Sequence, residues 1–143
     1  MYMYISTLAA ILLLGTAVLS SPIPDPDPNC STDRSILKSC KELTLDQDKH
    51  TLKASCQDCS GSWSPTSLDL NIILGNTNGK FTWGGIDFSK SARDTALDGQ
   101  TSILTATLDT GFEKEDEPGN VEVEDKINLS EKIQNEGGSL KFV

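Results

Sequence analysis

Cysteine is the residue type of this sequence whose number and spacing most directly indicate chemistry. The chain has four cysteines, at positions Cys30, Cys40, Cys56 and Cys59. The last two stand in the segment Cys-Gln-Asp-Cys, a spacing found in thiol redox pairs and in half of some zinc sites. However, no thioredoxin-like strand and helix pattern follows the segment, and the chain has a single histidine, His50. Disulfide bonds are therefore the favoured interpretation of all four cysteines.

The segment between Cys40 and Cys56 has the pattern of a β-hairpin. Its polar centre, residues 46–49, would reverse the chain and bring the two ends together. Among the three possible pairings, this favours a bond between Cys40 and Cys56. Cys30 would then pair with Cys59, which would tie the N-terminal tail onto the domain and close a longer loop.

The acidic residues are numerous, but their setting does not suggest catalysis. With one histidine, no Ser-His-Asp set can be argued, and the carboxylates lie mostly in loops that lack the apolar surroundings needed to raise a pKa. Glu115, Asp116 and Glu117 could bind calcium, but their spacing does not match an EF-hand. We therefore expect no enzymatic activity, no metal and no cofactor. The formal net charge of -9 would repel phosphate backbones, so we expect no nucleic acid partner.

The elements that must position these residues begin after an N-terminal leader. Residues 5–19 form an almost unbroken apolar run that is too short to span a bilayer comfortably, and small residues surround Ser20. We interpret residues 1–20 as a signal peptide, with an N-terminal membrane anchor as the alternative. Residues 21–35 have the composition of a stiff, solvated Pro/Asp-rich tail. The remaining chain, residues 36–143, is long enough for one domain. We expect the protein to be secreted and extracellular, with no contact with the membrane after signal cleavage.

This domain contains two copies of one pattern. The segment KSCKELTLD at 38–46 aligns with KSARDTALD at 90–98, and LDLNIILGNTNGKFTW at 68–83 aligns with INLSEKIQNEGGSLKF at 127–142. In this alignment Cys40 and Cys56 correspond to Ala92 and Thr107, and Asn76 corresponds to Asn135. We divide the domain accordingly into repeat one, residues 36–87, and repeat two, residues 88–143.

Each repeat predicts the same set of mainly β elements. In repeat one we expect strands at 43–46, 51–57 and 80–83, and a short helical turn at 68–74 that Ser67 could cap. In repeat two we expect strands at 95–98, 102–109 and 139–143, and a turn at 128–133. The Asn78-Gly79 pair tolerates positive φ and predicts a tight reversal into the last strand of repeat one. The apolar residues of this segment are expected in the core: Leu68, Leu70, Leu74, Phe81 and Trp83.

Together these segments resemble the cyanovirin-N homology (CVNH) family of mannose-binding lectins. The resemblance spans residues 36–143 and is carried by SLDLNIILGNTNGKFTW, GGIDFSKS and DKINLSEKIQNEGGSLKF, together with the cysteine pair that frames the first hairpin. It implies an elongated, mainly β, pseudo-symmetric fold in which strands from both repeats complete each half. It also implies a non-enzymatic lectin that binds mannose-rich glycans or glycoproteins, in particular terminal α1,2-linked mannose, without a cofactor.

The resemblance further implies one sugar site at each end of the molecule. The site that we call the tail-side site would contain Lys38, Ser39, Gln57, Asp58 and Asn135, with Cys59 and Glu136 beside them. The other, which we call the far-end site, would contain Asn76, Asn78, Asp87, Ser91, Asp109 and Thr110. Short polar side chains and backbone groups of this kind can orient neutral sugar hydroxyls.

Three departures from the family pattern give further expectations. Cys59 stands where better-known members have a polar hydroxyl residue, so we expect the two sites to be unequal, with the far-end site the stronger candidate by its side chains. The alternative is a secreted interaction module that keeps the fold but has lost sugar binding. Residues 110–125 form an acidic insertion, interpreted as a solvated loop, with a lid over the far-end site or a calcium loop as alternatives. Gly84 and Gly85 stand where the best-known member has a proline-containing hinge, and a flexible hinge should favour a monomer.

Overall fold

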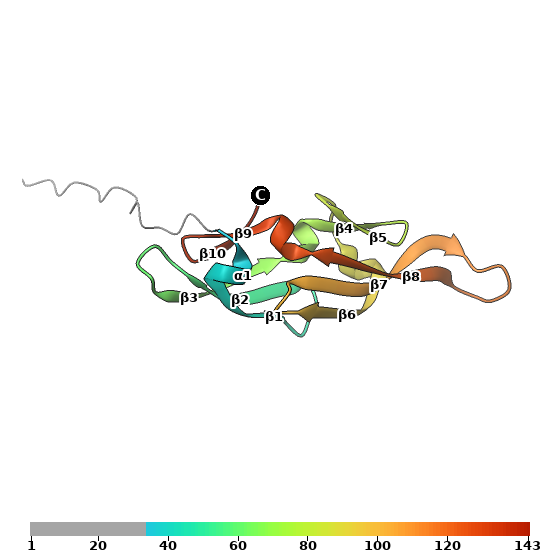
Figure 1. The fold of residues 1–143 in the computed structure, drawn as a ribbon. Helices are drawn as coiled ribbons and strands as arrows, with labels where there is room; N and C mark the ends of the chain where they lie inside the picture. Colours follow the sequence, from blue (N-terminus) through green and yellow to red (C-terminus); the bar gives the residue numbers. More distant parts are fainter. Residues whose placement is uncertain (1–33) are drawn as a thin grey trace, which may run out of the picture.

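The computed structural model describes residues 34–143, so the predicted signal peptide and all of the predicted tail except Arg34 and Ser35 lie outside the described residues. In chain order the elements are α1 (Ile36–Ser39), β1 (Cys40–Leu45), β2 (Thr51–Gln57), β3 (Trp63–Asp69), the 3-10 turn η1 (Leu70–Ile72), β4 (Leu74–Thr77), β5 (Lys80–Trp83), η2 (Phe88–Ser91), β6 (Ala92–Asp98), β7 (Ile103–Glu113), β8 (Asn120–Asn128), η3 (Leu129–Glu131), β9 (Ile133–Glu136) and β10 (Ser139–Phe142). The domain is mainly β, as predicted, and it is elongated, with the hairpin of β7 and β8 at one extremity (Figure 1). No helix among the described residues is both long and apolar enough to cross a membrane.

Two three-stranded antiparallel sheets share one construction. The strand order is β1-β2-β3 in the first sheet and β6-β7-β8 in the second. In the middle strands β2 and β7, every second residue is buried, so one face of each sheet packs inward. The register is equivalent in the two sheets, and the matching pairs include Cys40–Cys56 with Ala92–Leu108, and Gln57–Trp63 with Asp109–Glu122.

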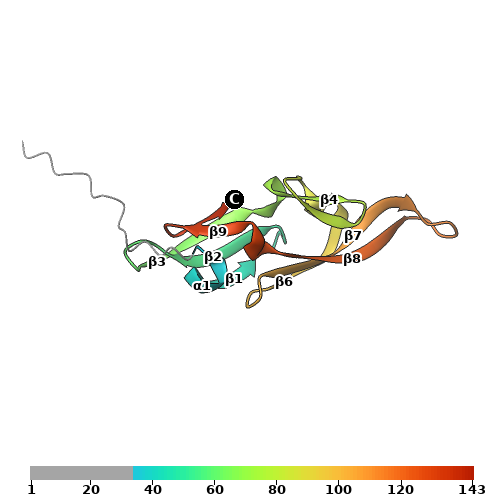
Figure 2. The same ribbon diagram turned by 45° about the horizontal axis from the view of Figure 1, so that its top comes forward.

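Each sheet is completed by a two-stranded hairpin from the other repeat. The β9–β10 hairpin lies against β1-β2-β3, where the Leu140 amide donates to Thr66 Oγ1 at 3.1 Å. The β4–β5 hairpin lies against β6-β7-β8, where the Phe81 amide donates to Asp125 Oδ2 at 2.9 Å. Figures 1 and 2 show both hairpins beside these sheets. This confirms the expectation that strands from both repeats complete each half.

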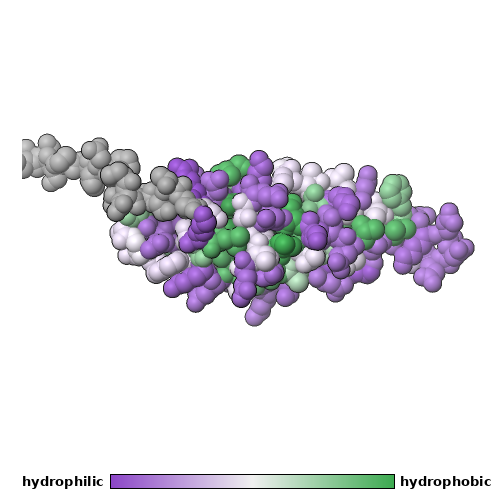
Figure 3. Space-filling model, viewed as in Figure 1, coloured by the Kyte–Doolittle hydropathy of each residue, from purple (hydrophilic) through white to green (hydrophobic). Residues whose placement is uncertain are grey.

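A hydrophobic core joins the two halves. Its fully buried side chains come from both repeats and include Leu52, Leu70, Leu74, Phe88, Leu104, Leu129 and Ile133. At the junction, Trp83 and its counterpart Phe142 stack with ring centroids 5.7 Å apart. Of the predicted core residues, Leu70 and Leu74 are fully buried, whereas Leu68, Phe81 and Trp83 pack at the edge of the core. Much of the surface around this core is polar, with small apolar areas between the polar ones (Figure 3).

The predicted helical turn at 68–74 is wrong in extent and in its cap. Strand β3 continues through Leu68 to Asp69, and η1 contains only Leu70–Ile72. The cap is the carboxylate of Asp69, which accepts a hydrogen bond from the Asn71 amide at 2.9 Å, so Ser67 has no capping role. The strand was missed because its sequence is rich in serine and contains Pro65, which is tolerated in a strand at the edge of its sheet.

The alignment of Cys56 with Thr107 is wrong by one residue. In the structure Ala92 pairs with Leu108, so Leu108 is the counterpart of Cys56. Both Cys56 and Leu108 are fully buried. Because strand side chains alternate between the two faces, a shift of one residue would turn the polar Thr107 into the core.

The acidic insertion, which we predicted to be a solvated loop, is exposed at residues 111–119 but is folded as a β-hairpin. Strand β7 continues to Glu113, β8 begins at Asn120, and the Lys114 amide closes the tip by donating to the Gly119 carbonyl at 3.0 Å. We call residues 110–121 the arm. It projects beyond the body along the long axis and does not fold back as a lid (Figures 1 and 2). No group of three or more His, Cys, Asp or Glu in the described part of the chain is placed to hold a metal ion.

Candidate functional site

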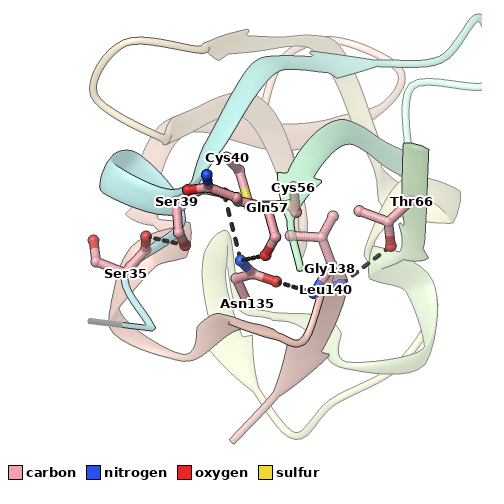
Figure 4. The surroundings of a disulfide bond; sticks show 9 residues. All are labelled: Ser35, Ser39, Cys40, Cys56, Gln57, Thr66, Asn135, Gly138 and Leu140. Atoms are coloured by element: carbon pink, nitrogen blue, oxygen red, sulfur yellow. Dashed lines mark hydrogen bonds between the residues drawn. A yellow bond between two sulfur atoms is a disulfide. The ribbon is translucent and has the colours of Figure 1, made fainter. Parts of the chain in front are cut away.

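The predicted disulfide between Cys40 and Cys56 is confirmed and lies beside the tail-side site (Figure 4). The two residues face each other on β1 and β2, with their Cα atoms 4.0 Å apart. Cys59 is also disulfide-bonded, whereas its predicted partner Cys30 lies outside the described residues. The Cys40–Cys56 bond fixes the two strand ends that carry Ser39 and Gln57.

Asn135 lies at the centre of the tail-side site. Its side chain is almost fully buried, and its Nδ2 donates to the Gln57 carbonyl at 2.8 Å and to the Ser39 carbonyl at 3.4 Å. Its Oδ1 accepts from the Gly138 amide at 2.9 Å, and Figure 4 shows these bonds converging on one side chain. Gly138 has a φ of 90°, and a Cβ there would lie 3.2 Å from the Cβ of Asp58, which explains the glycine. Asn135 thus pins the β9–β10 turn onto β2 and shapes the site.

Two other residues of the tail-side site also hold their own surroundings. Ser39 is buried, and its Oγ donates to the Ser35 carbonyl at 2.8 Å. Asp58 Oδ1 accepts from the hydroxyl and the amide of Ser60, at 2.7 and 2.8 Å. The Ser60 hydroxyl is the main reason why the pKa of Asp58 is lowered. This carboxylate therefore organises the turn between β2 and β3.

Lys38 and Gln57 are the exposed side chains of the tail-side site. Lys38 belongs to the short helix α1, and Gln57 is the last residue of β2. Gln57 Nε2 donates to the Gly61 carbonyl at 3.0 Å, which leaves its Oε1 on the solvent side for a further donor. Next to them, Arg34 and Glu136 form an ion pair at 3.2 Å between the end of the tail and β9.

The far-end site has the same central contact as the tail-side site. Asn76 Nδ2 donates to the Asp109 carbonyl at 2.7 Å and to Ser91 Oγ at 2.9 Å, and its Oδ1 accepts from the Gly79 amide at 2.9 Å. The structure therefore brings Asn76, Ser91 and Asp109 together. Asn76 pins the β4–β5 turn onto β7, just as Asn135 pins the other turn.

Two residues of the far-end site, Asp109 and Thr110, are engaged in hydrogen bonds at the base of the arm. Asp109 accepts from the Gly111 amide at 2.6 Å and from Asn120 Nδ2 at 2.8 Å, and these two bonds, in that order, lower its pKa. Thr110 is buried, and its Oγ1 donates to the Val121 carbonyl at 2.8 Å. The polar groups that could meet a ligand here already hold the two strands of the arm together.

Asp87 and Asn78 lie apart from this cluster, and both have positive φ, of 60° and 52°. Asp87 precedes η2, and its Oδ2 accepts from Lys90 Nζ at 2.7 Å. Asn78 is exposed at the tip of the β4–β5 turn, as the Asn-Gly signal predicted. The structure therefore does not bring the six predicted far-end residues into one hydrogen-bonded group.

Both ends suit hydrogen bonding to a neutral, hydroxylated ligand better than proton transfer. Each presents backbone groups and short polar side chains around a rigid turn. Where a carboxyl pKa is shifted among the described residues, hydrogen bonds lower it, as for Asp58 and Asp109, so these groups stay ionised at neutral pH and are not prepared as general acids.

Sequence reasoning missed several side chains at the two ends. Asn120 and Lys90 bind predicted site residues, and Trp63 is exposed beside Gln57 with Lys41 Nζ 4.4 Å from its ring centroid. The lone aromatic after the Cys-Gln-Asp-Cys turn was a visible signal for Trp63. Its partner Lys41 could be found only from the pairing of β1, β2 and β3.

The fold and its two ends define a class of protein: a pseudo-symmetric, mainly β domain of two interlocked repeats with one polar site at each end. Residues 37–141 match the CVNH domain family, and the chain belongs to this family. The cyanovirin-N homolog of Tuber borchii is 34% identical over 107 residues, which are 73% of this chain and 94% of that protein.

Solved structures of similar proteins have the same fold. A designed cyanovirin-N homolog lectin is 31% identical with a TM-score of 0.67, and the match covers 76% of this chain and 99% of that one. Microvirin, solved as a complex with mannobiose, is 26% identical with a TM-score of 0.64, and the match covers 76% of this chain and 98% of that one.

Proposed function

We propose that this protein is a lectin that binds mannose-rich glycans, and specifically terminal α1,2-linked mannose, through two unequal sites. The observation that carries the proposal is the equivalent construction of the two ends, where Asn76 and Asn135 each hold an exposed turn against the end of a central strand. The binding of mannobiose by microvirin supports the choice of sugar. Two modest sites on one molecule would raise its affinity for dense glycans by avidity.

The two sites differ in the side chains that remain for a ligand. At the tail-side site, Gln57 is exposed beside the organised turn. At the far-end site, Asp109 and Thr110 are engaged by the base of the arm, and Asp87 is paired with Lys90. We therefore propose that Gln57 makes the tail-side site the one with the more available side chain, which reverses the order expected from the sequence, and that the arm modifies specificity at the far end.

The test is binding of the protein without residues 1–20 to immobilised oligomannosides with and without terminal α1,2 linkages. Asn76 and Asn135 are unsuitable as binding variants, because both hold the fold together. We would substitute residues with solvent-accessible side chains instead: Gln57→Ala for the tail-side site and Asp87→Ala for the far-end site. Gln100→Ala is the matched control, since Gln100 is exposed in the β6–β7 turn outside both sites.

We expect each of the two site variants to lose part of the α1,2-mannoside signal and the double variant to lose most of it. Gln100→Ala should bind like the unmodified protein. The second candidate function is the interaction module without sugar binding, which the internal hydrogen bonding of Asn76, Asp58 and Asp109 favours. A folded protein that binds neither these mannosides nor another oligosaccharide would decide for this module and against the lectin.

We also propose that the protein is secreted and monomeric. The disulfide between Cys40 and Cys56 supports an oxidising compartment, and the packing of each two-stranded hairpin against the other repeat of the same chain supports a monomer. Expression of the full chain in eukaryotic cells should release a protein that begins near Ser21, which N-terminal sequencing would detect. A dimer as the main species in light scattering at micromolar concentration would contradict the monomer.

A further inference from the structure

Trp63 is an exposed aromatic residue beside the tail-side site that the sites described above do not use. It is the first residue of β3, faces Gln57 on β2, and keeps 44% of its surface accessible. The Lys41 ammonium reaches it from β1 and lies 4.4 Å from the ring centroid. The contact spans the middle strand, so the indole is held on the outward face of the first sheet.

The second half of the molecule shows that the fold does not require an aromatic residue at this position. By register, the counterpart of Trp63 is Glu122 and that of Lys41 is Arg93. Arg93 and Glu122 form an ion pair across the middle strand of the second sheet. One sheet therefore joins its outer strands by charges and the other by an exposed indole, although their backbones are equivalent.

The outward row of β3 from Trp63 to Ser67 lacks charge, whereas its counterpart on β8 is charged. Trp63, Pro65 and Ser67 point outward and carry no charge, whereas the matching residues of β8 are Glu122, Glu124 and Lys126. Side chains on one face of a strand repeat about every 6.8 Å, so the row is about 14 Å long. Its far part borders a shallow hollow of about 370 Å³ lined by Lys53, Ala54, Pro65, Thr66 and Ser67. A strip of uncharged β3 side chains with an aromatic end, bordered by Lys53 in its far part, thus runs from the tail-side site along the sheet.

We propose that this strip is an additional carbohydrate subsite, in which Trp63 stacks against a further pyranose ring of a glycan bound at the tail-side site. The proposal takes its ligand class from the proposed function, but it assigns different residues. The C–H face of a pyranose is apolar and matches the flat face of an indole, while serine hydroxyls and Gln57 can bind the ring substituents.

Lys41 has two roles in this subsite. Its contact restricts the indole before a ligand arrives, which lowers the entropy that binding must overcome. Its ammonium can also donate to a sugar hydroxyl at the edge of the ring. A longer chain would cover more of the strip beyond Gln57 than a disaccharide would, so Trp63 should favour longer glycans.

The test compares α1,2-mannobiose with a linear α1,2-mannotetraose by calorimetry, and follows the indole N–H signals of Trp63 and Trp83 by NMR. The variant is Trp63→Glu, which reproduces the ion pair of the second half by giving Lys41 a carboxylate partner, so the sheet should stay folded. We expect its affinity for the tetraose to fall about three- to tenfold, with a smaller loss of affinity for the biose. Trp63→Tyr should restore most of the lost affinity for the tetraose, and Gln57→Ala should weaken the binding of both ligands.

The outcomes separate the subsite from the proposed function. If Trp63→Glu binds both ligands like the unmodified protein while Gln57→Ala weakens both, the subsite is wrong and the lectin remains. If the protein binds neither mannoside, cellotetraose and chitotetraose are titrated next: a shift of the Trp63 signal by either, together with weaker binding of that sugar by Trp63→Glu in calorimetry, supports the subsite and refutes only mannose. If the protein binds neither mannoside and neither cellotetraose nor chitotetraose moves the Trp63 signal, both proposals fail.

Discussion

Asn135 Nδ2 donates to the carbonyl oxygen of Gln57 at 2.8 Å, although 78 residues separate the two in sequence. The counterpart bond, from Asn76 to the Asp109 carbonyl, is 2.7 Å long. In each case a side chain of one repeat fastens a hairpin to the middle strand of the other repeat. The hydrogen bonds of these two identical asparagines thus help to interlock the halves.

The first prediction concerns the stability that Asn135 supplies. Asn135→Ala should lower the free energy of unfolding by about 2–4 kcal/mol, because it leaves the Gln57 carbonyl and the Gly138 amide without a partner in a buried setting. Urea unfolding measures this. Lys141→Ala, an exposed change on β10, is the control and should stay within about 0.5 kcal/mol of the unmodified protein. Equal free energies of unfolding for the two variants would contradict a structural role for Asn135.

The second prediction concerns the link between the β4–β5 hairpin and β8. Partial burial opposes ionisation of Asp125, but its bonds from the Phe81 amide and Lys80 Nζ outweigh this and lower its pKa. Asp125→Ala should cost about 1.5–3 kcal/mol in the free energy of unfolding. Asp125→Thr should recover part of this loss, because Thr66 at the equivalent position accepts from the Leu140 amide with its hydroxyl. If threonine is no better than alanine in chemical denaturation, the equivalence of the two links is refuted.

The third prediction tests the register of the second sheet. The double variant Ala92→Cys with Leu108→Cys should form a disulfide, since these residues pair as Cys40 and Cys56 do. Closing such a loop is worth about 3 kcal/mol, and the loss of the buried leucine should reduce the net gain to about 1–2 kcal/mol. Titration of free thiols and urea unfolding check this. The control pair Ala92→Cys with Thr107→Cys should remain reduced, and bond formation there would contradict the register.

The fourth prediction is a pH dependence of stability. The Thr51 hydroxyl, with the Thr51 and His50 amides, binds the carboxylate of Asp48 and lowers its pKa from 3.8 to about 2. A carboxyl whose pKa is lower in the folded protein stabilises the fold above the unfolded pKa and loses this effect as the pH falls through the folded value. The stability difference between the protein and Asp48→Ala should therefore be largest above pH 4 and shrink toward pH 2.

Urea unfolding at a series of pH values measures this difference. Gln47→Ala, in the same exposed turn, is the control, because its stability difference should not depend on pH. A difference for Asp48→Ala that stays constant from pH 7 to pH 2 would rule out the proposed hydrogen bonding of the carboxylate.

The sequence by itself was enough for the features that depend on local pattern. The repeated segments predicted the mainly β class, and the alternation around the polar turn at 46–49 predicted the β1–β2 hairpin and, with it, the Cys40–Cys56 bond. The Asn78-Gly79 turn was also predictable, because positive φ at two successive residues demands such residue types. These features are encoded within a few residues of one another.

Only the tertiary structure decided what depends on strands that meet across the molecule. It extended the acidic insertion into paired strands, since pairing is a property of both β7 and β8 and not of either segment. It assigned Asn76 and Asn135 to holding the fold, because their partners Asp109 and Gln57 come from the other repeat. It also brought Lys41 over Trp63 across a strand that separates them. Hydrogen bonds and ring contacts act over a few ångströms in space, and a sequence does not reveal which distant residues come that close.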